Sequence, residues 1–326
     1  MAPRVSIVIR CFNEEEHIGR LLSGIMQQTV TDVEIIVVDS GSTDATLSIA
    51  TRYPVKVLTI RPEEFSFGRS LNTGCQAATA EFIVICSAHT YPVYNDWLEQ
   101  LLAPFADPRI ALAYGKQRGH EQTKYAEQQV FAHWFPAQSN WCQAHPFCNN
   151  GNAAIRRSLW QQWPYNEELT GLEDLDWAHR MITEGYRLAY VAEAEVVHVH
   201  NETWRQIYNR YRREAIAFKR IFPHEQFGLW DLIRLFTSNV LSDYYHAWQD
   251  RVLLQHLVEI PLFRWMQFYG TYRGYGHRGP ITGPLRQTFY YPRALTRPTP
   301  QMDATRRHRA IDYNRSAQEK SVGQVR

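Results

Sequence analysis

The sequence lacks any apolar run long enough to cross a bilayer. Its longest apolar runs, such as Val33–Val38 and Phe82–Cys86, are far shorter than the roughly 20 residues that a membrane-spanning helix needs. No basic segment followed by an apolar one precedes the first short apolar run, Val5–Ile9. We therefore expect neither a membrane span nor a signal peptide, and a protein that stays in the cytoplasm.

Cysteine is also scarce. The chain has five cysteines, and no two of them are spaced as C-x-x-C. An odd number of cysteines scattered through apolar runs argues against a disulfide framework and against a zinc site. We expect buried, reduced thiols, which fits a cytosolic compartment.

A large excess of charge of one sign is missing too. With 35 Lys and Arg against 33 Asp and Glu, the net charge is +2, too small for a protein whose main task is to bind nucleic acid. The charge is uneven, because residues 271–326 contain 11 Lys and Arg but 3 Asp and Glu, which gives this segment +8 and the rest −6. A basic terminus on a mildly acidic body suggests contact with an anionic surface.

Short β-rich runs alternate with helical stretches over the first 115 residues. The predicted strands are Val5–Ile9, Val33–Asp39, Val55–Ile60 and Phe82–Cys86, and the predicted helices cover about 15–28, 45–52, 68–78 and 97–105. Strict alternation predicts an α/β fold with a mostly parallel sheet flanked by helices. Ligands bind at the carboxyl ends of such strands, so we expect the chemistry in the loops after Ile9, Asp39 and Cys86.

The pattern changes beyond this part. Residues 115–165 are expected to form loops and a short helix over the sheet, and a helix over 173–184 with strands near 187–191 and 196–200 completes a predicted domain of residues 1–200. Residues 201–326 are expected to form a helical, aromatic and basic extension, with helices over 203–222, 229–248 and 252–269. Its aromatic residues either pack onto the first domain or dock on an anionic membrane; they include Trp230, Phe236, Trp248, Trp265 and Phe268.

Two acidic motifs stand out. Asp39 ends a buried strand, where a carboxylate accepts bonds from a base or ribose, while Asp44 after the Gly-Ser-Thr turn serves equally well as a helix N-cap. The run Thr170–Trp177 reads either as a capping box, with Asp176 pairing with Arg180, or as the site of a general base held at a helix start.

Three histidines also lie near predicted strand ends. His198 and His200 share one face of a strand because side chains alternate with period two. Such a pair binds a metal or a phosphate, or forms an ordinary hydrogen-bonded, half-buried feature. His89 follows Phe82–Cys86 and is either a ligand or a polar loop residue.

Taken in order, these motifs resemble the family 2 glycosyltransferases, inverting enzymes of the GT-A fold that use nucleotide-activated sugars, and within them the bacterial rhamnosyltransferase-like group. The stretches that carry the resemblance are Ser6–Glu15, Val37–Asp44, Cys148–Arg156, Tyr165–Glu167, Leu172–Arg180, Gly185–Tyr186 and Val197–Asn201. The likeness covers about residues 4–220.

The resemblance implies roles for individual residues. Asp174 matches the catalytic base, Glu173 orients it or the acceptor, and His200, or else His198, matches the histidine that approaches the diphosphate or its metal. The nucleotide-binding residues it implies are Asn13, Glu15, Asp39, Ser42 and Asp44, and those expected near the diphosphate or acceptor are Asn152, Arg156 and Trp177.

The metal motif departs from the family pattern. Ser87-Ala88-His89 stands where the family has Asp-x-Asp, so a cation there meets His89 and His200 as imidazole ligands. Mn²⁺ accepts nitrogen ligands better than Mg²⁺ does. The two alternatives are a divalent cation, Mn²⁺ before Mg²⁺, and a metal-free site in which a protonated His200 and Arg156 neutralise the leaving group.

We predict transfer of a hexosyl or deoxyhexosyl unit from a nucleotide sugar to a polysaccharide or lipid-linked acceptor, with inversion, at the inner face of a membrane. The chief alternative is a non-catalytic nucleotide-sugar-binding or scaffold protein of the same fold. Asp174 in its Glu-Asp setting argues against this alternative. A nicotinamide oxidoreductase is disfavoured because Arg10-Cys-Phe-Asn-Glu-Glu, and no G-x-G-x-x-G, follows the first strand.

Overall fold

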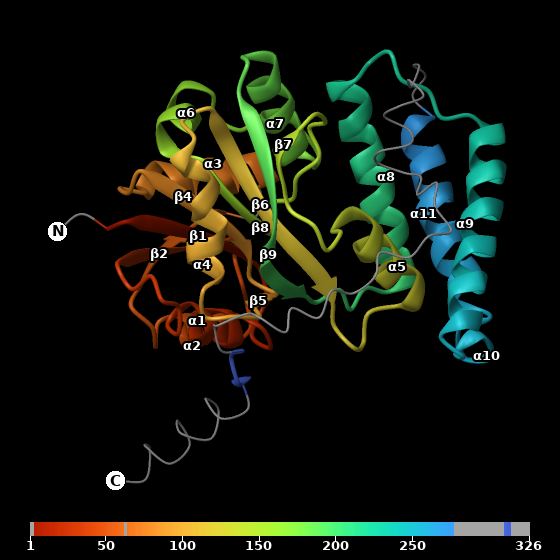
Figure 1. Ribbon diagram of the computed structural model, residues 1–326, viewed down its shortest axis with the longest axis horizontal. Coiled ribbons are helices and arrows are strands. Elements are labelled where there is room, and N and C mark those ends of the chain that lie inside the picture. The colour runs from red at the N-terminus through yellow and green to blue at the C-terminus, as the bar shows by residue number, and fades with distance from the viewer. Residues whose placement is uncertain (1–2, 62–63, 277–309, 314–326) are drawn as a thin grey trace, which may run out of the picture.

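A nine-stranded sheet forms the centre of the computed structural model, which describes residues 3–61, 64–276 and 310–313 (Figure 1). The strand order is β3-β2-β1-β4-β8-β6-β9-β5, with β7 paired to β9. The strands are β1 (Val5–Cys11), β2 (Val33–Asp39), β3 (Val55–Thr59), β4 (Phe82–Ser87), β5 (Thr90–Pro92), β6 (Ile110–Gly119), β7 (Asn140–Gln143), β8 (Asn152–Arg156) and β9 (Arg187–His198).

The N-terminal half of the sheet is parallel. Strand β1 pairs in parallel with β2 and β4, and β2 pairs in parallel with β3. Helices connect these strands, as parallel pairing requires. They are α1 (Ile18–Ile25), α2 (Thr46–Ala50) and α3 (Phe67–Ala77), while α4 (Trp97–Leu102) and the 3-10 helix Ala103–Ala106 lead from β5 to β6. The expected α/β architecture is confirmed, and the carboxyl ends of β1, β2 and β4 meet at one edge.

Residues 115–165 differ from the loops that we expected. They hold the end of β6, helix α5 (Tyr125–Trp134), β7, β8 and helix α6 (Arg157–Gln162). Strand β8 lies in the middle of the sheet and pairs antiparallel with β4 and β6. A central strand is covered on both faces, so its sequence, Asn-Ala-Ala-Ile-Arg, does not alternate between apolar and polar residues. Alanine is also a weak strand former. For these two reasons the sequence pattern did not predict β8.

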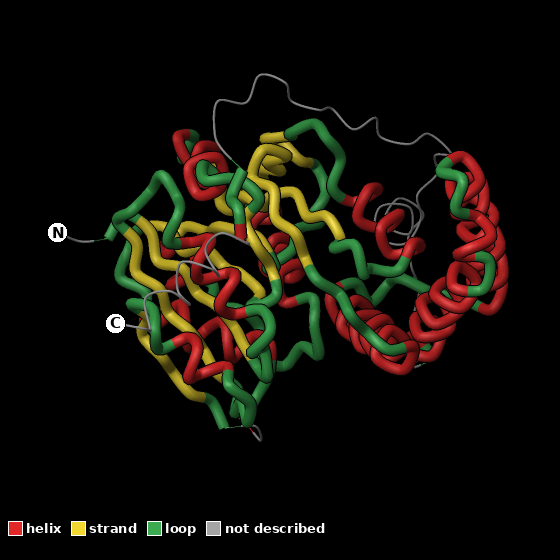
Figure 2. Tube along the Cα trace, turned by 90° about the horizontal axis from the view of Figure 1, so that it is seen from below, coloured by secondary structure: helices red, strands yellow, loops and turns green. Residues whose placement is uncertain are grey.

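A single strand replaces the two predicted near the end of the sheet. Strand β9 runs from Arg187 to His198, follows α7 (Glu173–Thr183) and pairs with β6 in parallel and with β5 and β7 antiparallel. Figure 2 shows these strands continuing the same sheet toward the helical part. The strand ends at His198, which carries the chain to the same edge as the ends of β1 and β4.

The helices of the C-terminal part form a group of their own beside the sheet (Figures 1 and 2). They are α8 (Trp204–Ile221), α9 (Leu229–Gln249), α10 (Leu253–His256) and α11 (Glu259–Tyr275). The first two lie where we expected them, whereas the helix predicted over 252–269 is divided into α10 and a later α11. Helix α11 packs between α8 and α9 and also contacts α5. Within the described residues, no helix is long and apolar enough to cross a membrane. Most of the basic tail, residues 277–309 and 314–326, lies outside the described residues.

Candidate active site

A cleft of about 700 Å³ opens where the carboxyl ends of β1, β4 and β9 meet the start of α7 and the side of α8. Seven of the residues predicted for the site line it, namely Asn13, Glu15, Asp44, His89, Glu173, Asp174 and His200. A smaller hollow of about 160 Å³ adjoins it beside Phe12, Ser40 and Phe65. The cleft collects loops that are far apart in the sequence, as the sheet topology requires.

The loops after β1 and β2 are bonded to each other at the rim of the cleft. The Asn13 amide donates to Ser42 Oγ (2.9 Å), the Glu15 amide to Asp44 Oδ2 (3.1 Å), and the Ala45 amide to Glu15 Oε2 (2.8 Å). These side chains therefore build a paired loop, and Asn13 adopts a positive φ of 54° within it. Their contact with a nucleotide stays a prediction.

Asp39 lies beneath this loop and is 1% exposed. Its carboxylate accepts the amides of Gly41 (3.0 Å) and Ser42 (3.1 Å) and the thiol of Cys11 (3.7 Å). Gly41 has a φ of 93°, which favours glycine. Neither Asp39 nor Ser42 lines the cleft, so Asp39 shapes the turn at the edge of the nucleotide site that we predict.

Asp174 lies at the floor of the cleft and is 9% exposed. Its carboxylate accepts the amides of Asn150 (3.0 Å) and Leu175 (2.8 Å). Burial, followed by the charge of Glu173, raises the pKa of Asp174 to about 7. A carboxyl group with such a pKa can take up a proton near neutral pH, which is what a general base requires.

The backbone at the start of α7 differs from a capping box. Leu172 precedes the helix in the left-handed conformation, with φ 56°, and Thr170 donates its hydroxyl to the carbonyl of Arg213. Glu173 is bonded instead to Arg10 (3.1 Å), which ends β1. A strained residue at this position is typical of functional sites, and the strain is maintained by the surrounding packing. The expected pair of Asp176 with Arg180 is present at 3.0 Å.

Three imidazoles meet at the opposite side of the cleft. Ligand nitrogens of His89, His198 and His200 all lie within 4.8 Å of one another, and His198 Nε2 is 3.1 Å from His200 Nε2. Sequence periodicity predicted the pairing of His198 with His200, and the β4–β5 turn adds His89. Spatial proximity makes His198 a full member of the cluster.

Each of these rings is held by an oxygen acceptor on its other nitrogen. The Nδ1 atoms of His89, His198 and His200 each lie 2.7 Å from an oxygen, of Glu14, Gln117 and Glu127 respectively. These oxygens only accept, so each Nδ1 donates its proton to one of them. At 3.1 Å, the Nε2 atoms of His198 and His200 need a positive charge between them, which is either a proton on one ring or a bound cation. Metal-ligating histidines have this second-sphere pattern.

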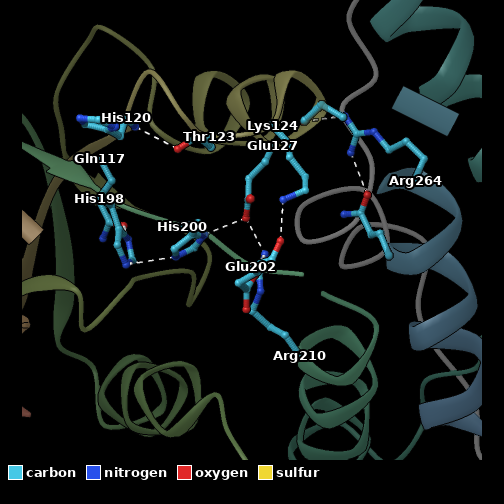
Figure 3. A network of polar contacts seen from close by, with 12 residues as sticks. Gln117, His120, Thr123, Lys124, Glu127, His198, His200, Glu202, Arg210 and Arg264 are labelled. Atoms are coloured by element: carbon cyan, nitrogen blue, oxygen red, sulfur yellow. Dashed lines mark hydrogen bonds and ion pairs between the residues drawn. The ribbon is translucent and has the colours of Figure 1, made fainter. Parts of the chain in front are cut away.

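A buried polar network anchors His200 to the helical part (Figure 3). Glu127 on α5 bonds both His200 and Arg210 of α8, and Arg210 also pairs with Glu202 (2.6 Å). Lys124 donates to the carbonyl of Glu202 (2.5 Å). The charges of Arg210 and His200 lower the pKa of Glu127 to about 2 against the opposing effect of burial. Sequence patterns gave no signal for Glu127, because His200 and Arg210 are 73 and 83 residues away from it along the chain.

Three residues that we predicted near the diphosphate or acceptor lie outside the cleft. Arg156 ends the antiparallel strand β8 and therefore lies at the opposite edge of the sheet, where its guanidinium donates to the carbonyls of Phe105 and Ile110. Asn152 is fully buried and bonds the Trp97 indole at 2.9 Å. Trp177 is a core residue. In the metal-free alternative, protonated His200 and Arg156 together neutralise the leaving group. Because Arg156 lies at the other edge of the sheet, it is not available for this role.

The cleft carries more negative than positive side chains. Its carboxylates are those of Glu14, Glu15, Glu16, Asp44, Glu173, Asp174, Glu202 and Glu214, and its guanidinium groups are those of Arg10, Arg210 and Arg213. Arg10 and Arg210 are already paired with carboxylates. A diphosphate placed in this cleft needs additional positive charge, and the three imidazoles offer the ligands to hold it.

The fold resembles that of the GT-A glycosyltransferases. The family model "Glycosyl transferase family 2" matches residues 6–163. The O-antigen chain rhamnosyltransferase WbaN of Salmonella anatum is 32% identical over 57% of this chain and 62% of its own length, so that match spans less than two thirds of the relative. The O-antigen chain rhamnosyltransferase RfbN of Salmonella typhimurium is 28% identical over 64% of this chain and 70% of its own length.

The same fold is found in a solved structure. The mannosyltransferase PcManGT from Pyrobaculum calidifontis, in complex with GDP-Man and Mn²⁺, superposes with a TM-score of 0.56 at 21% identity, covering 84% of this chain and 85% of that one. The match to the glycosyl transferase family 2 model thus covers just under half of this chain, within the stretch for which we predicted the resemblance. The predicted GT-A-like fold is confirmed.

Proposed function

We propose that this protein transfers a hexosyl or deoxyhexosyl unit from a nucleotide sugar to a hydroxyl of a polysaccharide or lipid-linked acceptor, with inversion. The observation that carries the proposal is Asp174, a buried carboxyl group with a pKa of about 7 on the floor of the cleft. Two relatives of this chain are named as rhamnosyltransferases, and rhamnose is a deoxyhexose, which supports a deoxyhexose donor. We place the reaction in the cytoplasm at the inner face of a membrane.

The residues of the cleft divide the work between them. Asp174 takes the proton of the acceptor hydroxyl, whose own pKa lies far above neutrality, as the hydroxyl attacks the anomeric carbon. Glu173, bonded to Arg10, keeps a second carboxylate beside the base and helps to raise its pKa. The paired loop of Asn13 and Asp44 faces the nucleotide, and the three histidines lie where the diphosphate leaves.

A divalent cation is the group that the histidine cluster fits. His89, His198 and His200 would hold it, and it would supply positive charge to the departing diphosphate. Imidazole ligands favour Mn²⁺ over Mg²⁺, because Mg²⁺ prefers oxygen.

The cation preference is testable without turnover. We expect the protein treated with a chelator to bind Mn²⁺ more tightly than Mg²⁺ by calorimetry, and His198→Ala to weaken Mn²⁺ binding by more than about tenfold. Donor hydrolysis should then recover more with Mn²⁺ than with Mg²⁺. Full activity in chelator would contradict the role of a cation, and equal binding of both ions would contradict the preference.

The turn beneath the nucleotide site gives a second prediction. Asp39→Ala should weaken binding of the free nucleoside diphosphate by about 1.5–3 kcal/mol, because the amides of Gly41 and Ser42 lose a charged acceptor and the turn loosens. Asp32→Ala, an exposed carboxylate just before the other end of β2, is the matched control. Calorimetric affinity that is unchanged in the Asp39 variant would remove Asp39 from the nucleotide site.

The proposed reaction itself is tested on a panel of nucleotide sugars. We expect one donor to be hydrolysed slowly alone and faster with a glycan acceptor, and the anomeric signal of the first product, followed by nuclear magnetic resonance, to show inversion. Binding of nucleotide sugars without turnover of any of them would favour a non-catalytic binding protein. A product of retained configuration would contradict Asp174 as a base in a single displacement.

A further inference from the structure

The outer face of α9 carries a continuous apolar stripe. Trp230, Leu241 and Trp248 are 72%, 63% and 65% exposed, and they recur at 11 and 7 residues, close to whole numbers of helical turns. Ile233 and Tyr245 flank them on the same face. The stripe is about 27 Å long at 1.5 Å per residue.

The stripe continues beyond the end of α9. Leu254 in α10 is 88% exposed, and Val258 after it is 74% exposed. Soluble surfaces seldom expose so many large apolar side chains together, and such patches mark sites that bind a partner or a membrane. The expected aromatic set thus divides in two, because Phe268 is fully buried in the helical core while Trp230 and Trp248 point outward.

The inner face of α9 is fixed, so this outward orientation is built into the fold. Asp243 on that face accepts two bonds from Arg264 of α11, at 2.7 and 2.9 Å, and both side chains are buried. Leu232 and Leu235 pack into the same helical core. Helix α9 lies on the side of α11 away from α8 and the sheet (Figure 1), which leaves the stripe on the outside of the molecule.

Charge indicates which partner fits. Among the exposed residues of α9, all of which the structure describes, the charged side chain is Arg234. Arg251, between α9 and α10, is exposed as well. The segment that follows these helices in the sequence, residues 277–326, contains ten Lys and Arg against three Asp and Glu. Indole rings on an apolar stripe whose exposed charges are positive are typical of helices that lie in the interface of an anionic bilayer.

We propose that the outer face of α9, with α10, docks the protein flat on a bilayer surface containing anionic lipid. This inference rests on the proposed function only in its purpose, which is to bring the cleft to a surface where a lipid-linked acceptor resides.

The test uses sedimentation of the full chain with two kinds of vesicle, phosphatidylcholine alone and phosphatidylcholine with phosphatidylglycerol. We expect the protein to sediment with the anionic vesicles, and Trp230→Ser/Leu241→Ser/Trp248→Ser to lower its partition coefficient at least tenfold. The matched control is Met26→Ser/Trp141→Ser, which removes two exposed apolar side chains from the sheet domain and should bind as the parent does. Circular dichroism and calorimetric nucleotide binding should be the same in all three proteins.

Four outcomes would overturn the proposal: no sedimentation of the parent, equal sedimentation of the triple variant, equal binding to both kinds of vesicle, or a parent dimer that the triple variant converts to a monomer. The last would show that a second copy covers the stripe. Because nucleotide binding is measured without vesicles, failure of docking is distinguishable from failure of the proposed transferase activity.

Discussion

Asp174→Asn is expected to lower turnover by about 10²–10⁴-fold while leaving donor binding intact. The amide keeps the shape of the side chain but takes up no proton from the acceptor hydroxyl, so the contribution of general base catalysis is lost. Turnover is measured by release of nucleoside diphosphate, and donor binding by calorimetry.

Asp176→Asn is the matched control, because Asp176 lies two residues along the same helix and pairs with Arg180 outside the cleft. Loss of this partly exposed pair should cost well under 1 kcal/mol of stability and leave turnover unchanged. Similar turnover in the two variants would refute Asp174 as the base.

The pH dependence of the reaction should follow the same carboxyl group. Since Asp174 acts as its carboxylate, kcat/KM should rise with pH and level off above about pH 7, the raised pKa of this group. Its pKa in the unfolded chain is about 3.9, so the folded protein binds the proton more tightly and loses stability as the pH rises through about 7. Asp174→Asn stays neutral and should be more stable than the parent at pH 8 in urea unfolding. A variant that is less stable at that pH would contradict the raised pKa.

Glu127→Gln is expected to have the second large effect, on stability and on cation binding together. Glu127 is 2% exposed and bonds both His200 and Arg210, so removal of its charge leaves a buried guanidinium with Glu202 as its remaining acidic partner. Breaking a buried ion pair in this way costs about 3 kcal/mol. Replacing the charged acceptor that orients His200 with a neutral amide should also weaken Mn²⁺ binding by about 10–100-fold. Urea unfolding and calorimetry measure the two effects.

Asp243→Asn separates these effects. It breaks an ion pair with Arg264 that is more deeply buried than that of Glu127 with Arg210, on helices that do not line the cleft. We expect a similar loss of stability and an unchanged affinity for Mn²⁺. Weakened cation binding in both variants would show that general loosening, and not the contact of Glu127 with His200, is responsible.

The local part of the fold was readable from the sequence. Strands β1 to β4 and the helices between them were predicted within a few residues, since hydrophobic periodicity and turn residues act over short distances. The three long C-terminal helices were found for the same reason. The α/β class followed from the alternation of elements, and the resemblance to the family and the roles proposed for Asp174 and His200 followed from motifs that stand in a fixed order along the chain.

What the sequence left open depends on contacts between distant segments. The antiparallel direction of β8 sends Arg156 to the far edge of the sheet, and no local pattern distinguishes this from a parallel strand. The pairing of Glu173 with Arg10 spans 163 residues, and the histidine cluster joins a turn after β4 to the end of β9. The outward stripe on α9 likewise exists only because the buried pair of Asp243 and Arg264 fixes which face turns inward. Periodicity determined the elements, whereas strand direction and long-range packing decided which side chains share the cleft.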